Sequence, residues 1–188
     1  MVQIKSQREL EIMRQAGKLA ARVLIELSKM IRPGVSLVEL NNTAESLTLD
    51  MGARPAFKGY MGYPYSLCTS VNEQVVHGLP SSRKLVAGDI IGLDFGLCYQ
   101  GFFSDSAVTL PVGEVSDRAK KLMQITKDSL YAGIDSCRAG NTLKDIAKAV
   151  EAKVIPQGYG IFREFVGNGI GSSLHEDPKV PNYVAGAV

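Results

Sequence analysis

The sequence predicts an α+β fold made of two related halves. Capping signals followed by apolar residues at helical spacing indicate one helix pair within residues 7–51 and another within residues 116–155. Between the pairs, residues 65–112 contain short apolar runs and turn residues that are typical of antiparallel strands. A shift of 106 positions relates the two helix pairs. Together, these observations indicate a duplicated unit in which a helix pair is followed by a sheet.

The first helix pair is marked by two capping signals. Ser6 and Glu9 form a Ser-x-x-Glu box, in which each side chain can accept a hydrogen bond from the other's free backbone N–H. We expect a helix over about residues 7–30, ended by the Pro-Gly pair that follows. A second Ser-x-x-Glu box predicts a helix over about residues 36–51.

The middle of the chain is expected to form the sheet. Two short strands are predicted, at Leu67–Val71 and at Gln74–Val76. The strongly apolar run Ile90–Cys98 is a third strand, and Phe102–Pro111 is its antiparallel return. We place the hairpin turn between them at Tyr99–Gly101.

Helical signals return after the sheet. Helices are expected over about residues 116–137 and 142–155, followed by a strand at Ile161–Val166. The segment Gly167–Gly171 reads Gly-x-Gly-x-Gly, which is only part of a dinucleotide-binding fingerprint. We therefore interpret these glycines as positions where the backbone passes close to a site.

The internal repeat is clearest at the turns within the helix pairs. Residues 32–40 and 138–146 share Arg, Gly and Leu at equivalent positions, and Gly52 and Gly158 end the second helices at the same shift. Convergence on one turn chemistry is the alternative explanation. The duplication is favoured because the shift holds along the whole helix.

The repeat sets the expected domain organisation. The first half continues for about 60 residues after its helix pair, whereas only 30 residues follow Gly158. We expect one domain over residues 1–188, with a first half to about residue 113. The second half, about 114–188, is expected to be incomplete, so that the chain is a truncated form.

Composition narrows the function classes. The chain has 188 residues, 45% of them hydrophobic, with 21 basic and 19 acidic side chains and a net charge of +2. It has no basic cluster for nucleic acid, and no apolar run near the about 18 residues of a membrane helix. Its three cysteines argue against a disulfide framework. We expect a cytoplasmic monomer.

Two aspartates are candidate metal ligands. Asp94 lies in an apolar strand, where a carboxylate must be paired, protonated or metal-bound, and Asp105 lies on the return strand. A turn centred at Tyr99 and Gln100 would set the two residues opposite each other. A divalent cation between them would remove their repulsion. The alternatives are a buried ion pair for Asp94 and a polar loop position for Asp105.

The two histidines, His77 and His175, both stand where a loop is expected. An isolated histidine is usually structural or a surface residue. In a chain with a carboxylate pair, these two are candidates for binding or proton transfer.

At several motifs the sequence resembles the type I methionine aminopeptidases, which have the pita-bread fold of two pseudo-symmetric halves. The resemblance covers nearly the whole chain, and its motifs occur in the family's order. These motifs are Tyr60–Pro64, Ser70–Glu73, His77–Pro80, Gly88–Ile90, Leu93–Asp94, Ser104–Ser106 and Gly167–Pro178.

The resemblance implies a metal-dependent enzyme that removes the N-terminal methionine from peptides and nascent chains. It implies two divalent ions (Co, Mn, Fe or Zn), with Asp94 and Asp105 among the ligands. It makes His77 and His175 the catalytic residues that hold the substrate. It also implies that the methionine side chain is lined by Phe57, Tyr60, Tyr63, Cys68 and Leu174.

Two departures from the family bear on activity. Asn168 stands where the family has a metal-binding histidine, and an amide is a weaker ligand than imidazole. The family's two glutamate ligands would fall beyond Val188. We therefore expect this chain to be impaired or inactive. A non-catalytic pita-bread binding module is the alternative, while the short N-terminal region argues against a prolidase-type relative.

Overall fold

The computed structural model describes residues 2–184, which form two compact units. The N-terminal unit comprises residues 4–116 and 170–174. The C-terminal unit comprises residues 117–169 and 175–184, together with residues 2–3. The sequence pattern places a boundary near residue 113 but gives no sign that residues 170–174 pack with the N-terminal unit.

The helices of the N-terminal unit begin where the capping signals predict. Helix α1 spans Gln7–Met30, and the Glu9 carboxylate accepts a hydrogen bond of 2.7 Å from the Ser6 N–H. Helix α2 spans Leu37–Asp50, and the Ser36 hydroxyl accepts a bond of 3.3 Å from the Glu39 N–H. Both helices therefore start from a side chain that satisfies a free backbone donor.

Four strands form the sheet of this unit, with β3 (Ile90–Tyr99) at its centre. Strand β4 (Phe102–Pro111) pairs with the whole of β3 along one edge. Strands β2 (Leu67–Val71) and β1 (Arg54–Pro55) pair with successive parts of the other edge. All of the pairings are antiparallel, as the sequence predicts for the hairpin.

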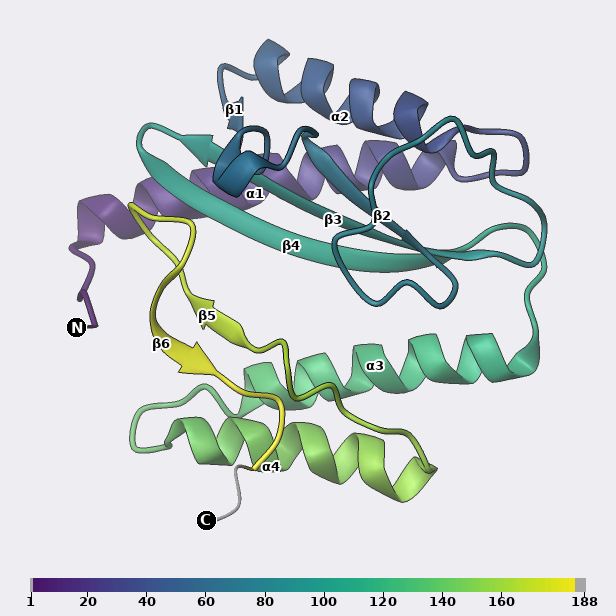
Figure 1. The fold of residues 1–188 in the computed structure, drawn as a ribbon. Helices are drawn as coiled ribbons and strands as arrows, with labels where there is room; N and C mark the ends of the chain where they lie inside the picture. The colour runs from purple at the N-terminus through teal and green to yellow at the C-terminus, as the bar shows by residue number, and fades with distance from the viewer. Residues whose placement is uncertain (1, 185–188) are drawn as a thin grey trace. The chain divides into compact units, whose positions relative to one another are not determined.

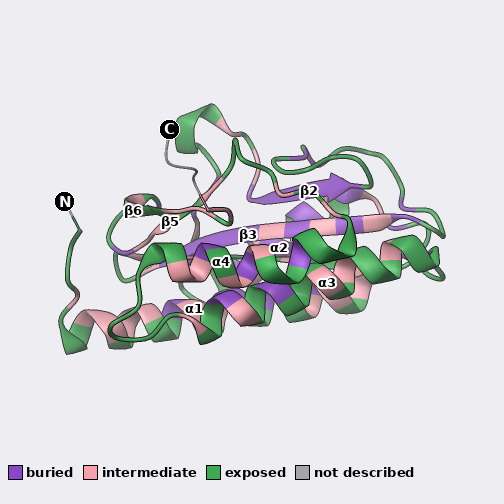
Figure 2. Ribbon diagram, turned by 90° about the horizontal axis from the view of Figure 1, so that it is seen from below, coloured by how far each residue is buried: buried purple, intermediate pink, exposed green. Residues whose placement is uncertain are grey.

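Helices α1 and α2 cover one face of this sheet (Figure 1). The buried core lies between the helices and the sheet, and in Figure 2 it follows β2, β3 and a stripe along α1. Its fully buried side chains include Leu27, Leu40, Leu67, Leu93 and Phe95. Because side chains alternate along a strand, the residues between these positions in the strands point to the opposite face.

Two predicted strands are absent from the structure. Residues Gln74–Val76 form part of a loop, because the chain turns back at Val71: the Gln74 side chain accepts a 2.9 Å hydrogen bond from the Val71 N–H. The backbone pairing expected of this segment is made instead by Gly78 with Thr69. Residues 161–166 are also irregular, and strand pairing begins only at Gly167.

The C-terminal unit contains a second helix pair. Helix α3 spans Asp117–Asp135 and helix α4 spans Leu143–Val154, which a 3₁₀ helix continues at Ile155–Gln157. The helices pack closely at Gly133, where an added Cβ would lie 3.3 Å from a Val150 methyl carbon. No helix within residues 2–184 is long and apolar enough to cross a membrane.

A two-stranded ribbon explains part of the glycine-rich segment. Strand β5 (Gly167–Gly169) pairs with β6 (Glu176–Val180), and a Cβ on Gly169 would lie 2.3 Å from the Asp177 carbonyl oxygen. At this position glycine is therefore required by close backbone approach between two strands.

Candidate active site

The face of the sheet opposite α1 and α2 carries the candidate metal ligands. In the register, Cys68 pairs with Asp94, Asp94 with Ala107, and Gly96 with Asp105. Directly paired residues point to the same face, and so do residues two apart on one strand. Asp94 and Asp105 therefore project from one face of adjacent antiparallel strands, as the sequence predicts.

The two aspartates are diagonal neighbours, so the expectation that they lie directly opposite is wrong. The hairpin turn is centred on Gln100 and Gly101, one residue later than expected. Both residues have positive φ, 48° for Gln100 and 86° for Gly101, as a tight two-residue hairpin turn requires. The later turn shifts the partner of Asp105 from Asp94 to Gly96.

Asp94 is half-buried, and the environment disfavours its charged form. Burial is the main cause that raises the pKa of Asp94 well above its ordinary value, and the nearby Asp105 carboxylate raises it further. Two carboxylates in such proximity repel one another when both are ionised. A divalent cation would remove that cost, so this donor pair fits one.

An apolar cluster of the N-terminal unit lies beside the two aspartates, because its member Cys68 is the strand partner of Asp94. Its members come from three separate stretches of chain, because the β1–β2 region, β4 and the 170–174 segment meet here. The buried members are Ala56, Phe57, Cys68 and Leu174, and the partly buried ones are Tyr63, Phe103 and Ile170. The cluster thus contains four of the residues expected to line the methionine pocket.

Cys68 and Tyr63 are both kept neutral in this cluster. Burial raises the pKa of the Cys68 thiol to about 11, and the Asp94 and Asp105 carboxylates also raise it. Burial likewise raises the pKa of Tyr63, whose hydroxyl interacts with the Cys68 thiol. Both groups therefore offer an uncharged, polarisable lining that suits an apolar side chain.

His77 lies in an exposed loop that is tied to β2. Its φ of 57° is in the left-handed region, which a non-glycine residue adopts only when its surroundings hold it there. The next residue, Gly78, donates its N–H to the Ser70 hydroxyl at 3.2 Å, and its carbonyl accepts from the Thr69 N–H at 2.8 Å. A Cβ on Gly78 would lie 2.2 Å from the Thr69 oxygen, so only glycine fits.

Besides the two aspartates and His77, three more predicted site residues lie outside the apolar cluster. Tyr60 is 38% exposed on a 3₁₀ helix at Tyr60–Gly62. His175 and Asn168 belong to the C-terminal unit, where His175 is exposed just before β6. The Asn168 amide nitrogen donates a 2.7 Å hydrogen bond to the Gly169 carbonyl. Within residues 2–184 no three His, Cys, Asp or Glu side chains gather as a metal-binding group.

Sequence reasoning missed three members of the cluster, Ala56, Phe103 and Ile170. Phe103 stands two residues before Asp105, so strand alternation puts it on the same face and could have identified it. Ile170 reaches the cluster because Gly171, its neighbour, accepts a 2.8 Å hydrogen bond from the Phe103 N–H. No local sequence signal indicates that long-range contact.

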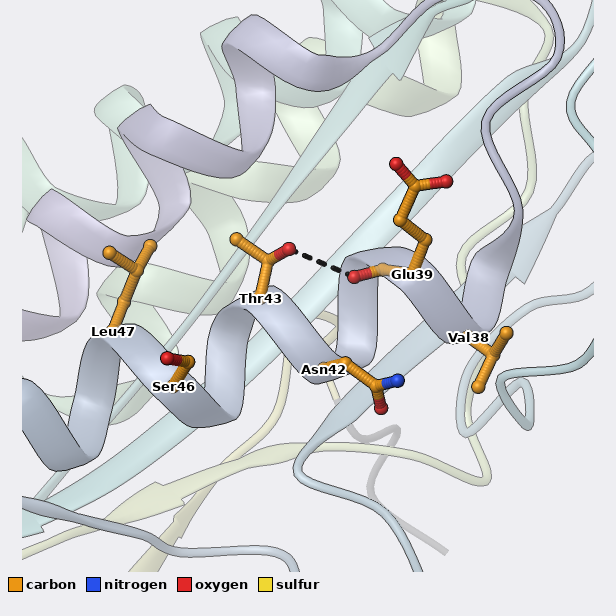
Figure 3. Close-up of a pocket in the computed structure, with 6 residues that line it drawn as sticks. All are labelled: Val38, Glu39, Asn42, Thr43, Ser46 and Leu47. Atoms are coloured by element: carbon orange, nitrogen blue, oxygen red, sulfur yellow. Dashed lines mark hydrogen bonds between the residues drawn. The ribbon is translucent and has the colours of Figure 1, made fainter.

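A groove of about 490 Å³ lies elsewhere, on the outward face of α2 (Figure 3). It is lined by Val38, Glu39, Asn42, Thr43, Ser46 and Leu47. The Thr43 hydroxyl donates a 3.0 Å hydrogen bond to the Glu39 carbonyl, so it serves its own helix. None of the expected site residues lines this groove.

Comparison with known proteins agrees with the chemistry of this face. Residues 11–187 match Metallopeptidase family M24, and the chain belongs to that family. Its relatives within the family include methionine aminopeptidase 1 of Bacillus subtilis, 46% identical over 97% of this chain and 74% of that protein. The crystal structure of methionine aminopeptidase from Thermotoga maritima is 40% identical, with a TM-score of 0.96 over 100% of this chain and 76% of that one.

The same comparisons establish the pita-bread fold and a metalloaminopeptidase type of hydrolase. The prolidase from Pyrococcus horikoshii shares the fold at a TM-score of 0.85, but it is 27% identical and this chain covers 51% of it. The resemblance to methionine aminopeptidases that the motifs indicate is therefore confirmed.

Proposed function

We propose that this chain acts on the N-terminal methionine of peptides and nascent chains in the cytosol, as a metal-dependent methionine aminopeptidase. One observation carries the proposal: a close carboxylate pair and a neutral apolar cluster lie together on the face of one sheet that is opposite α1 and α2. An aminopeptidase for methionine needs both features, one to hold metal and the other to hold a thioether side chain.

The apolar cluster is suited to the methionine side chain. Phe57 and Leu174 are 9% and 3% exposed and offer apolar walls, while the protonated Cys68 thiol adds a soft surface. A flexible thioether packs well against aromatic and sulfur groups. We assign Tyr63 to the same wall and Tyr60 to its exposed rim.

Asp94 and Asp105 are the residues that would hold the divalent ions, two of them in this proposal. When bound, such ions supply Lewis acidity and make water nucleophilic at neutral pH. We assign His77 and His175 to hydrogen bonding with the substrate's backbone, where an imidazole can stabilise developing negative charge. The neutral amide at Asn168 is expected to weaken metal binding.

Metal binding tests the first half of this proposal. We expect the 188-residue chain to develop the visible absorption of bound Co²⁺, and Asp94→Asn and Asp105→Asn to abolish it. Glu114→Gln is the matched control, because Glu114 is an exposed carboxylate between β4 and α3. Equal Co²⁺ binding by all four proteins would contradict the carboxylate site.

Methionine release tests the second half. With Co²⁺ or Mn²⁺ added, release of methionine from Met-Ala-Ser by this chain should be weak, because the amide of Asn168 is a poorer ligand than a histidine, and the release that occurs should require both aspartates. Release that persists in Asp94→Asn or after chelation would overturn the proposed chemistry. A chain that binds Co²⁺ and L-methionine but releases none would favour the binding module that Asn168 suggests.

A further inference from the structure

The loop that carries Tyr60 and Tyr63 contains no β-strand. Residues 58–66 connect β1 to β2 and follow directly after Phe57. Three of its residues, Gly59, Met61 and Gly62, have left-handed backbone, with φ of 85°, 47° and 84°. Backbone hydrogen bonds within the loop, such as that from the Tyr63 N–H to the Tyr60 carbonyl at 2.9 Å, shape its turn locally. Its place against the rest of the unit therefore depends on contacts from outside the loop.

Helix α2 supplies a buried contact at the C-terminal end of this loop. The Asn41 side-chain oxygen accepts hydrogen bonds from the Ser66 N–H at 2.9 Å and the Leu67 N–H at 3.3 Å. Asn41 is 4% exposed, so its amide is unavailable to water and is oriented by these partners. Its nitrogen donates to the Asn42 side chain at 3.1 Å.

One turn further along α2, Glu45 binds both ends of the loop. One carboxylate oxygen accepts from the Lys58 ammonium at 2.6 Å, and the other accepts from the Ser66 hydroxyl at 2.8 Å. Both bonds lower the pKa of Glu45, and the bond from Lys58 has the larger effect. Glu45 is therefore ionised at neutral pH and joins two residues eight positions apart in the sequence.

We infer that Asn41 and Glu45 are positioning residues of the substrate pocket: from α2 they fix the loop that presents Tyr60 and Tyr63 beside Phe57. The role of the pocket in this inference rests on the proposed function. The contacts of Asn41 and Glu45 with the loop do not depend on it. Neither residue belongs to the apolar cluster, so each acts through the loop.

The contacts also extend toward His77. The Tyr63 hydroxyl lies 3.0 Å from the Leu67 carbonyl oxygen and 3.3 Å from the Gly78 carbonyl oxygen. The loop fixed by Glu45 therefore abuts the segment that holds His77. Loosening the loop should weaken methionine binding without changing the carboxylate pair on β3 and β4.

The test replaces Glu45 and follows the loop directly. We expect Glu45→Ala to raise amide hydrogen exchange in residues 58–66 by about tenfold, since it removes two bonds to a charged group. Exchange in β3 should be unchanged. The L-methionine dissociation constant should rise by a similar factor, while Co²⁺ affinity stays the same. Glu39→Ala makes the same change on the outward face of α2 and should alter none of these.

The intermediate variant Glu45→Gln keeps one acceptor and should fall between wild type and Glu45→Ala in both measurements. Unchanged loop exchange in Glu45→Ala and Asn41→Ala overturns the inference, whatever the protein's function. Faster exchange with unaltered methionine affinity overturns the positioning role alone. A wild-type chain that binds no L-methionine, with loop exchange as expected, contradicts the proposed pocket while the contacts stand.

Discussion

Gly96 lies directly against the ring of Phe57, so that a Cβ added at Gly96 would stand 2.7 Å from Phe57 Cε1. It would also stand 3.2 Å from the Ala56 Cβ. The Gly96 carbonyl accepts a 2.9 Å hydrogen bond from the Ala56 N–H, which holds β1 against β3. A hydrogen in place of a side chain therefore lets an aromatic wall form beside Asp94 and Asp105.

The variant Gly96→Ala should displace the Phe57 ring. We expect a loss of about 1–3 kcal/mol in the free energy of unfolding, the usual cost of overpacking a closed site. L-methionine affinity should fall as well, since the ring is a pocket wall in our proposal. Urea unfolding and calorimetric titration measure the two effects.

Gly92→Ala is the matched control for that variant. Gly92 lies on the same strand and face, but an added Cβ would meet its nearest atom, the Ser70 carbonyl oxygen, at an ordinary 3.6 Å. It should be neutral or slightly stabilising. If both variants lose stability equally, the contact with Phe57 is not the cause.

The Tyr63 hydroxyl gives a second prediction. Tyr63→Phe removes the hydrogen bond to the Leu67 and Gly78 carbonyls while keeping the ring. We expect a loss of about 0.5–1.5 kcal/mol in stability, and faster amide exchange at His77 and Gly78. Hydrogen exchange followed by mass spectrometry reports on that segment directly.

The neighbouring Tyr65 provides the comparison. Its ring packs edge-on against Tyr63, with centroids 6.1 Å apart, but its hydroxyl makes neither of these contacts. Tyr65→Phe should therefore leave exchange at His77 unchanged. Faster exchange in both variants would mean that general loosening, and not the Tyr63 hydroxyl, governs the loop.

The helices and the hairpin were predictable because local signals and tertiary structure agree there. Ser6 and Glu9 mark the start of α1, and the apolar run from Ile90 is long enough to fix the central strand. Strand alternation then placed Asp94 and Asp105 on one face. The diagonal offset of the two aspartates was not predicted, because a turn placed one residue later moves the register of β3 and β4 by two positions.

The contacts around the pocket depend on distant parts of the chain, and no periodicity encodes them. Asn41 looks like an ordinary helix residue until Ser66 is seen to donate to it from 25 positions away. Val75 and Val76 have strand-like composition, yet they stay in a loop because Gly78 makes the pairing with Thr69. Such positions are set by the packed sheet.

Asp89 leads to a prediction about pH. Its carboxylate accepts hydrogen bonds from the Asn72 side chain at 2.7 Å, the Val86 N–H at 3.1 Å and Arg83 at 3.3 Å. Burial alone would raise the pKa of Asp89, but these bonds together outweigh it and lower the pKa. The network is therefore formed by the ionised carboxylate.

A lowered pKa in the folded state means that the ionised group stabilises the fold above its unfolded pKa of about 3.9. That stabilisation is lost as pH falls through the folded value. At pH 7 we expect Asp89→Asn to cost about 1–3 kcal/mol, and the difference from wild type to shrink below about pH 4. Urea unfolding of both proteins from pH 7 to pH 3 measures this. A difference that is constant with pH would refute the role of the charge.

The last prediction concerns Asn168, which stands where related sequences are expected to supply a metal-binding histidine. An imidazole is a stronger ligand than a neutral amide for Co²⁺, Fe²⁺ or Zn²⁺. Asn168→His should therefore raise Co²⁺ affinity, by about 10–100-fold, a span typical of changes around a metal site. The dissociation constant follows from titrating the visible absorption of bound Co²⁺.

Lys148→His controls for the mere addition of an imidazole, because Lys148 is exposed on α4, a helix that carries none of the candidate ligands. It should leave Co²⁺ affinity unchanged. A double-mutant cycle completes the test: if Asn168 and Asp94 serve one metal site, Asn168→His should give no gain in an Asp94→Asn background. An equal gain with Asp94 present or absent would show that the new histidine binds Co²⁺ on its own, and the metal assignment of position 168 would be wrong.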